Sequence, residues 1–199
     1  MKTLIINGSP RKDGDTAKLT QILKQNLSGD IIEISAFYDD IRSCFDCRTC
    51  WEKEGCATPD DMQKIYDDSY DNVVIASPVY TSNLPGPIIN IQSRFNFLYN
   101  NKKHLNFVPE HKNKIGAVIL VAGGCKSPDI KEDTSLQTAK NILIRMHATL
   151  PDENIITYLS TDVAPAISDQ TTIDKVTQLA KRLSFQEETI PLQEEFHEN

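Results

Sequence analysis

Five short, continuously apolar runs alternate with amphipathic segments along this chain of 199 residues. Continuous rather than alternating hydrophobicity is typical of parallel strands that are buried on both faces. The segments between the runs carry apolar residues at the helical spacings of three and four. The pattern predicts a three-layer α/β domain with a parallel sheet and right-handed crossovers. The runs span residues 4–6, 31–34, 73–76, 115–121 and 155–159.

The helices expected between these strands begin near residue 15, after Thr58 and at Pro87, where one helix continues to Leu98. Two more are expected over residues 136–146 and 173–183. No composition shift or linker divides the chain before its end. We therefore predict one domain over residues 1–186, followed by a polar C-terminal tail over residues 187–199.

Composition limits the partners of this domain. The formal net charge of -7 argues against a nucleic-acid partner, because phosphate backbones are bound by basic surfaces. No apolar run approaches the roughly 20 residues that a membrane-spanning helix needs. The first residues lead directly into a short strand and lack a signal-peptide pattern. We expect a cytoplasmic protein that acts on a small molecule and does not bind a membrane.

The loop over residues 7–16 joins the first strand to the first helix. A helix N-terminus after such a loop binds phosphate, because unpaired backbone N–H groups and the helix dipole converge there. Ser9, Arg11 and Thr16 add two hydroxyls and a cation. The spacing matches neither a nucleoside-triphosphate P-loop nor a dinucleotide fingerprint. The loop therefore predicts a different kind of phosphate site.

Two further loops leave the carboxyl ends of predicted strands, where ligands bind in sheets of this kind. One runs from Ser77 to Gly86 and contains Tyr80 between prolines and polar residues. It is suited to border a planar heterocycle and to offer it backbone N–H donors. The other loop contains Gly123 and Gly124, which let the backbone approach a ligand closely.

Taken in order, these motifs resemble the flavodoxin-like NAD(P)H-dependent FMN reductases, including the group called iron–sulfur flavoproteins. The resemblance extends from Met1 to about Leu183. The motifs that carry it are Gly8-Ser9-Pro10-Arg11 with Thr16, Cys44-x-x-Cys47-x-x-Cys50-Trp51 with Cys56 and Asp60-Asp61-Met62, Ser77-Pro78-Val79-Tyr80, and Gly123-Gly124.

The resemblance implies a flavodoxin-like, doubly wound α/β fold with a five-stranded parallel sheet of order 2-1-3-4-5 that holds FMN. It implies that Ser9, Arg11 and Thr16 bind the FMN phosphate. The isoalloxazine ring would be bordered by Pro78, Val79, Tyr80, Thr81, Ser82 and Asn83 on one side and by Gly123 and Gly124 on the other. It also implies a homodimer or homotetramer.

The expected function is that of an FMN-dependent oxidoreductase. It takes hydride from NADH or NADPH and reduces a small acceptor such as a quinone, a nitro or azo compound, or free flavin. The flavin carries this chemistry, so no catalytic side chain is predicted. The alternatives are an iron–sulfur flavoprotein that relays single electrons, and a non-enzymatic redox sensor whose thiols switch a binding surface.

Four of the five cysteines form the pattern C-x2-C-x2-C-x5-C, with Cys44, Cys47, Cys50 and Cys56. The compact spacing suits a [4Fe–4S] cluster better than a zinc ribbon, which needs two separated knuckles. Related FMN reductases keep a similar loop without a cluster, so free thiols are the interpretation favoured from sequence. Cys125 is expected to be an ordinary thiol near the third loop.

Two charged residues near the predicted flavin site carry separate expectations. A carboxylate beside a phosphate is repulsive, so we expect Asp15 to turn outward or to cap the helix. Arg94 lies on the helix that follows the second loop. For this residue a surface ion pair is the favoured interpretation, and the alternatives are balancing ligand charge or reaching a neighbouring subunit.

Overall fold

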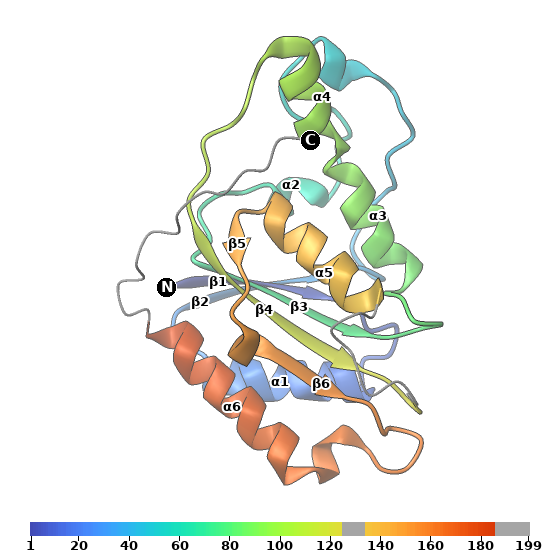
Figure 1. Ribbon diagram of the computed structural model, residues 1–199, viewed down its shortest axis with the longest axis vertical. Helices are drawn as coiled ribbons and strands as arrows, with labels where there is room; N and C mark the ends of the chain where they lie inside the picture. The colour runs from blue at the N-terminus through green and yellow to red at the C-terminus, as the bar shows by residue number, and fades with distance from the viewer. Residues whose placement is uncertain (125–133, 186–199) are drawn as a thin grey trace.

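A parallel β-sheet forms the middle layer of the protein in a computed structural model, which describes residues 1–124 and 134–185 (Figure 1). Its strand order is β2-β1-β3-β4-β5, and β6 also pairs with β4. All of these pairings are parallel. The strands are β1 (Lys2–Asn7), β2 (Asp30–Ser35), β3 (Asn72–Pro78), β4 (Lys114–Val121), β5 (Ala148–Thr149) and β6 (Ile155–Tyr158).

The predicted 2-1-3-4-5 order is confirmed, but the prediction of five strands is wrong at one edge of the sheet. Two short strands, β5 and β6, both lie beside β4 where one strand was expected. Pro151 and the 3-10 turn Asp152–Asn154 separate them. Proline has no N–H to donate to a ladder, so the strand is interrupted there and resumes at Ile155.

Helices cover both faces of this sheet (Figure 1). On one face lie α1 (Asp15–Asn26) and α6 (Gln170–Ser184), and on the other lie α2 (Met62–Ile65), α3 (Gly86–Arg94) and α5 (Thr134–Arg145). The helix α4 (Asn96–Leu105) continues from α3 at the top of Figure 1, beyond the sheet. The helix predicted over residues 87–98 is therefore divided at Phe95, and the helix expected after Thr58 is only one turn.

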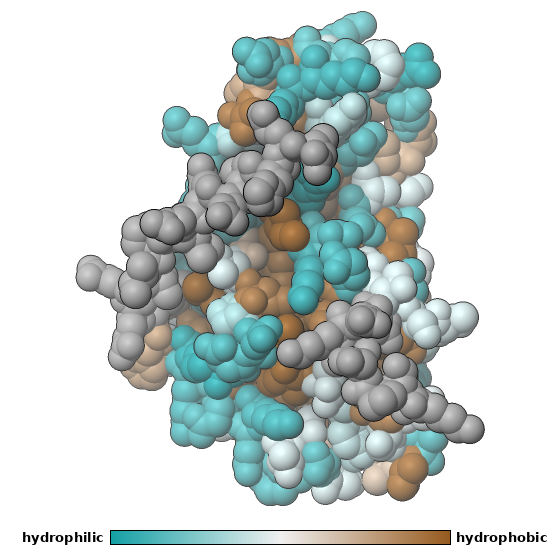
Figure 2. Space-filling model, viewed as in Figure 1, coloured by the Kyte–Doolittle hydropathy of each residue, from teal (hydrophilic) through white to brown (hydrophobic). Residues whose placement is uncertain are grey.

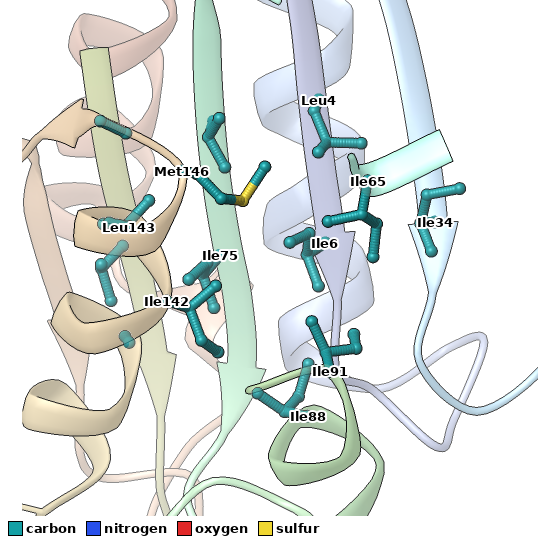
Figure 3. Close-up of a cluster of buried hydrophobic side chains, with 14 of the residues drawn as sticks. Leu4, Ile6, Ile34, Ile65, Ile75, Ile88, Ile91, Ile142, Leu143 and Met146 are labelled. Carbon is teal, nitrogen blue, oxygen red and sulfur yellow. The ribbon is translucent and has the colours of Figure 1, made fainter. Parts of the chain in front are cut away.

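Two apolar clusters, one on each face of the sheet, hold the layers together. Figure 3 shows Ile6 and Ile75 of the central strands facing Ile88 of α3 and Ile142 of α5. Burying one such side chain stabilises the fold by about 1.5–3 kcal/mol. Successive residues from Ala117 to Val121 of β4 alternate between the two clusters, which explains why this part of the strand is continuously apolar.

Apolar side chains reach the surface on one face of the protein. Figure 2 shows brown, apolar side chains concentrated in the middle of the viewed face, with mostly teal, hydrophilic side chains toward its two ends. Within the described residues, no helix is long and apolar enough to cross a membrane. Cys125 and the predicted tail over residues 187–199 lie outside the described residues.

Candidate functional site

The three predicted ligand loops meet in a hollow at the carboxyl ends of β1, β3 and β4. Of the residues predicted to bind FMN, those that border this hollow are Ser9, Arg11, Thr16, Pro78, Val79, Tyr80 and Gly123. Thr81, Ser82, Asn83 and Gly124 do not border it. Asp15 and Thr161 also border the hollow, although neither was predicted to bind FMN.

The first loop is shaped by its own serine. The Ser9 hydroxyl donates to the Arg11 carbonyl oxygen at 2.7 Å and accepts a hydrogen bond from the Arg11 N–H at 3.2 Å. The Ser9 N–H in turn donates to Asn7 Oδ1 at 2.9 Å. These bonds fold the loop back toward α1. In this arrangement the Ser9 hydroxyl sets the loop conformation and is already engaged.

The N-terminus of α1 offers donors to the hollow. Gly14 is the N-cap and makes no side-chain cap, and among the described residues no hydrogen bond uses the N–H of Asp15, Thr16 or Ala17. The Thr16 side chain is buried and borders the hollow. The Arg11 side chain lies over Gly14, with its Nε 3.2 Å from where a Cβ of residue 14 would stand. A cation and unpaired N–H groups therefore meet at this helix end.

Asp15 is bonded away from these donors. Its Oδ1 accepts a hydrogen bond from the Ala166 N–H at 2.7 Å, which ties α1 to the short 3-10 turn Ala166–Ser168. The carboxylate is thus engaged with a neighbouring turn although Asp15 borders the hollow, and its orientation relative to a bound phosphate stays a prediction. The helix-capping alternative is not what the structure adopts, because Gly14 is the N-cap.

Asn7 and Gly8 support the loop from behind. Asn7 Nδ2 donates to Glu33 Oε1 at 2.8 Å, and Lys24 Nζ donates to Glu33 Oε2 at 2.7 Å. Burial alone would raise the pKa of Glu33, but these partners outweigh burial and lower it. At Gly8 a Cβ would stand 2.6 Å from Ser77 Oγ, so only glycine lets β1 pass β3 this closely.

The second loop is a two-residue hairpin. Tyr80 and Asn83 pair through both backbone hydrogen bonds, at 2.8 and 3.0 Å. The two residues between them have positive φ values, 50° at Thr81 and 57° at Ser82. Such turns normally use glycine or asparagine, and a β-branched residue with positive φ is strained. Strain of this kind is concentrated at ligand-binding sites.

This hairpin narrows the set of backbone donors that the second loop can offer. The Val79 N–H donates to the Val121 carbonyl, and the N–H groups of Tyr80 and Asn83 bond each other's carbonyls. Within the described part of the chain, the N–H groups of Thr81 and Ser82 have no such partner. The Asn83 side chain anchors the loop, because its Oδ1 accepts from the Thr138 hydroxyl at 3.1 Å.

The third loop is covered by a residue that sequence reasoning missed. A Cβ at Gly123 would stand 2.4 Å from Asp162 Oδ1, so the exposed Asp162 side chain lies directly against this glycine. Asp162 lies in the loop after β6, next to Thr161, whose N–H donates to the Ala122 carbonyl at 3.0 Å. The sequence did hold a signal for it, because loops after parallel strands meet at one edge of the sheet.

The four clustered cysteines border a second, small hollow beside α3 and α4. Cys44 and Cys47 are exposed, whereas Cys50 and Cys56 are partly buried. The turn Thr49–Trp51 packs on α4, with the Trp51 ring stacked on His104 at 4.3 Å. Figure 1 shows this loop at the top of the molecule, far along α3 from the arrowheads of the strands.

Two side chains from the helices donate to cysteine sulfurs. Asn100 Nδ2 lies 3.5 Å from Cys50 Sγ, and Arg94 Nη2 lies 3.3 Å from Cys56 Sγ. Burial raises the pKa of Cys50 despite its bond from Asn100. Bonds from Thr49 lower the pKa of the exposed Cys47. The four thiols are therefore not equivalent.

The prediction that Arg94 makes a surface ion pair is wrong. Its side chain and that of Asp60 are both fully buried, and Arg94 Nη1 donates to Asp60 Oδ2. Burial alone would raise the pKa of Asp60, but Arg94 and the Arg42 N–H outweigh it and lower that pKa. The sequence placed Arg94 on a helix but gave no sign that the cysteine loop covers that helix.

Arg94 also holds both ends of the cysteine loop. Its Nη1 donates to the Arg42 carbonyl at 3.0 Å, before the cysteines, and its Nη2 donates to the Thr58 carbonyl at 3.4 Å, after them. Its Nε is buried and has no hydrogen-bond partner in the described part of the chain. One guanidinium therefore closes the base of the loop.

The comparisons with known proteins agree with this geometry. The sequence model of the family described as NADPH-dependent FMN reductase matches residues 1–155. The chain belongs to this family. Among solved structures, an FMN-dependent NADH-azoreductase from Bacillus anthracis in complex with FMN is similar, with a TM-score of 0.61 and 18% identity over 93% of this chain and 100% of that one. The flavodoxin-like fold predicted from the motifs is thereby confirmed.

The curated relatives of this FMN reductase family member include several iron–sulfur flavoproteins. One, from Methanosarcina thermophila, is 31% identical over 130 residues, which cover 62% of this chain and 64% of that protein. Another, from Archaeoglobus fulgidus, is 29% identical over 135 residues, which cover 65% of this chain and 58% of that protein. The chain therefore spans less than two thirds of the length of either relative.

The donor sets of this FMN reductase family member fit two groups. The helix N-terminus, Arg11 and Thr16 offer the kinds of donor that bind a phosphate. The cysteines offer four thiolate ligands, the number that a [4Fe–4S] cluster takes. Among the described residues no three His, Cys, Asp or Glu side chains lie close enough together to hold a metal ion, so the four thiols border the hollow without being gathered around one centre.

Proposed function

We propose that this protein is an FMN-dependent oxidoreductase that takes hydride from NADH or NADPH and reduces a small acceptor. Candidate acceptors are quinones, nitro or azo compounds and free flavin. The observation that carries the proposal is the hollow at the carboxyl ends of β1, β3 and β4, which is bordered both by the N-terminus of α1 and by Tyr80 of the strained hairpin.

The residues have distinct roles in this proposal. Arg11, the Thr16 hydroxyl and the free N–H groups of α1 hold the phosphate of FMN. Thr81 and Ser82 lie in the exposed hairpin next to Tyr80, just beyond the residues that border the hollow, and their unpaired N–H groups would supply donors to the ring, where negative charge gathers on reduction. Bound FMN supplies the hydride and electron chemistry. Tyr80, 48% exposed, offers an aromatic surface beside it.

Steady-state kinetics under anaerobic conditions test this proposal. We expect FMN-loaded protein to oxidise NADH or NADPH in the presence of a quinone or azo dye, with the parallel reciprocal plots of ping-pong kinetics. Loss of activity in Arg11→Ala, with partial return at high FMN, would support the assigned phosphate site. A protein that binds FMN but oxidises neither nucleotide with any of these acceptors contradicts the proposal.

The cysteine loop supports a second proposal, that Cys44, Cys47, Cys50 and Cys56 hold a [4Fe–4S] cluster. Sequence alone favoured free thiols. The observation that favours ligation is that all four cysteines border one hollow, into which two buried side chains direct N–H donors toward sulfur. The names of the relatives from Methanosarcina thermophila and Archaeoglobus fulgidus support the same proposal.

Iron analysis of anaerobically prepared, iron-replete protein tests the cluster. We expect about four irons per chain in the wild-type protein. Replacing Cys47 and Cys50 by serine should remove the iron, whereas Cys125→Ser, a matched control outside the pattern, should retain it. Iron near zero in the wild-type protein contradicts the cluster. A colourless protein without flavin or iron supports the thiol redox sensor instead.

A further inference from the structure

We propose that Asn100 and Arg94 set the reduction potential of a cluster on the cysteine loop by donating hydrogen bonds to the sulfurs of Cys50 and Cys56. The inference rests on the proposed cluster and goes beyond it, because it assigns a role to side chains that are not ligands. It is carried by two buried N–H groups, 3.5 and 3.3 Å from these sulfurs.

Asn100 is a donor aimed at sulfur and not a general loop anchor. Its side chain is buried in α4, and its amide nitrogen bonds Cys50 Sγ. The next residue, Asn101, anchors the loop backbone instead. It donates to the carbonyls of Cys50 and Lys53 at 2.6 and 3.1 Å and accepts from the Gly55 N–H at 2.7 Å. Of these two adjacent side chains, Asn100 therefore contacts a sulfur and Asn101 contacts the loop backbone.

Arg94 is held in place by groups other than the sulfur. Asp60 pairs with its Nη1, and the carbonyls of Arg42 and Thr58 accept its remaining bonds. The nitrogen beside Cys56 therefore needs no rearrangement to donate. A fixed donor in a buried site interacts more strongly with charge than a mobile donor in water.

Hydrogen bonds to cluster sulfurs raise the reduction potential. Reduction adds one electron, whose charge spreads onto the iron and the ligand sulfurs. An N–H directed at a ligand sulfur stabilises the reduced form more than the oxidised form. Removing such a donor leaves the ligands in place and lowers the potential. Only the difference in bond strength between the two oxidation states affects the potential, and we expect one donor to change the reduced-to-oxidised ratio about tenfold.

Potentiometry of the anaerobic, cluster-loaded full-length protein tests the inference, with iron content measured on each sample. We expect Asn100→Leu to keep its iron and to lower the midpoint potential by about 59 mV, the shift that equals a tenfold change for one electron. Asn100→Gln, which keeps an amide donor, should recover part of this shift. Asn96→Leu is the matched control, because Asn96 lines the same hollow from the same helix but bonds no sulfur among the described residues.

The outcomes separate the two proposals. A wild-type potential in Asn100→Leu with full iron overturns the inference and leaves the cluster standing. Absence of iron in the wild-type protein overturns both. If Asn100→Leu loses its iron, Arg94→Lys decides, because lysine keeps the charge beside Asp60 but lacks the second nitrogen at Cys56. An unchanged potential in an iron-loaded Arg94→Lys then overturns the inference, and a lowered one supports it.

Discussion

The buried ion pair between Asp60 and Arg94 should be a main determinant of stability, and Asp60→Asn tests it directly. The substitution keeps the shape of the side chain but removes the acidic partner of the buried guanidinium. Asp60 also accepts from the N–H groups of Arg42 and Met62, at 3.1 and 3.2 Å. An asparagine whose amide nitrogen faced Arg94 would place one N–H donor against another, so no hydrogen bond could form between them.

The expected loss follows from burial. Removing one partner of a fully buried pair leaves an uncompensated charge and costs about 3–5 kcal/mol. For a chain of this size the melting temperature should fall by roughly 6–20 °C, at about 2–4 °C per kcal/mol. Asp61→Asn is the matched control, because Asp61 pairs with Lys64, whose side chain is 55% exposed. Its loss should be much smaller.

Urea unfolding at pH 7 with equal, saturating FMN measures these losses. The double variant Asp60→Leu with Arg94→Met should be more stable than either single variant, since no charge is left buried alone. If Asp60→Asn costs no more than Asp61→Asn, the reasoning about this buried pair is refuted.

Three further predictions concern the loops around the first hollow. Arg11→Ala should weaken FMN binding tenfold or more while changing riboflavin binding little, because one charge-assisted bond to phosphate is worth about 1.5–3 kcal/mol; equal losses in the two titrations would remove the phosphate assignment. Gly8→Ala should lower both stability and FMN affinity, because its Cβ would meet Ser77 Oγ at 2.6 Å. In parallel thermal melts the control Gly86→Ala should be tolerated, because no atom lies within 4 Å of its Cβ. In the folded protein, the hydrogen bonds from Asn7 and Lys24 outweigh burial and lower the pKa of Glu33. The contribution of Glu33 to stability is therefore present above its ordinary pKa and is lost as pH falls through the lower folded value. Urea midpoints at pH 6 and pH 3 should therefore differ less in Glu33→Gln than in the wild-type protein, and an equal difference would contradict this.

The fold was predictable because its signals are local. A strand such as β4 is apolar at almost every position. Its place in a sheet that is buried on both faces could therefore be predicted without knowing which strands pair with it. The division of the last strand was less visible. It depends on Pro151 and a short turn, which interrupt the hydrogen-bond ladder without changing the apolar pattern around them.

The site was predictable in its loops but not in its contacts. The sequence identified the loop that carries Tyr80, yet the positive φ values at Thr81 and Ser82 result from the hairpin that closes around them. Burial of Arg94 depends on a partner 34 residues earlier, which no local pattern reveals. Asp162 was missed because the loop after the last strand was not considered together with the other loops at this edge of the sheet, where it lies against Gly123. The homodimer or homotetramer expected from resemblance stays a prediction.

Single-turnover reduction of bound flavin tests the proposed function most directly. Protein loaded with one FMN per chain is mixed anaerobically with NADPH, and separately with NADH, while the flavin absorbance near its visible maximum is followed. We predict that at least one nucleotide bleaches the flavin band completely in a single rapid phase, and that Arg11→Ala retains less FMN at the same concentration. A flavin band that neither nucleotide bleaches, in protein that has bound FMN stoichiometrically, would contradict the proposed function.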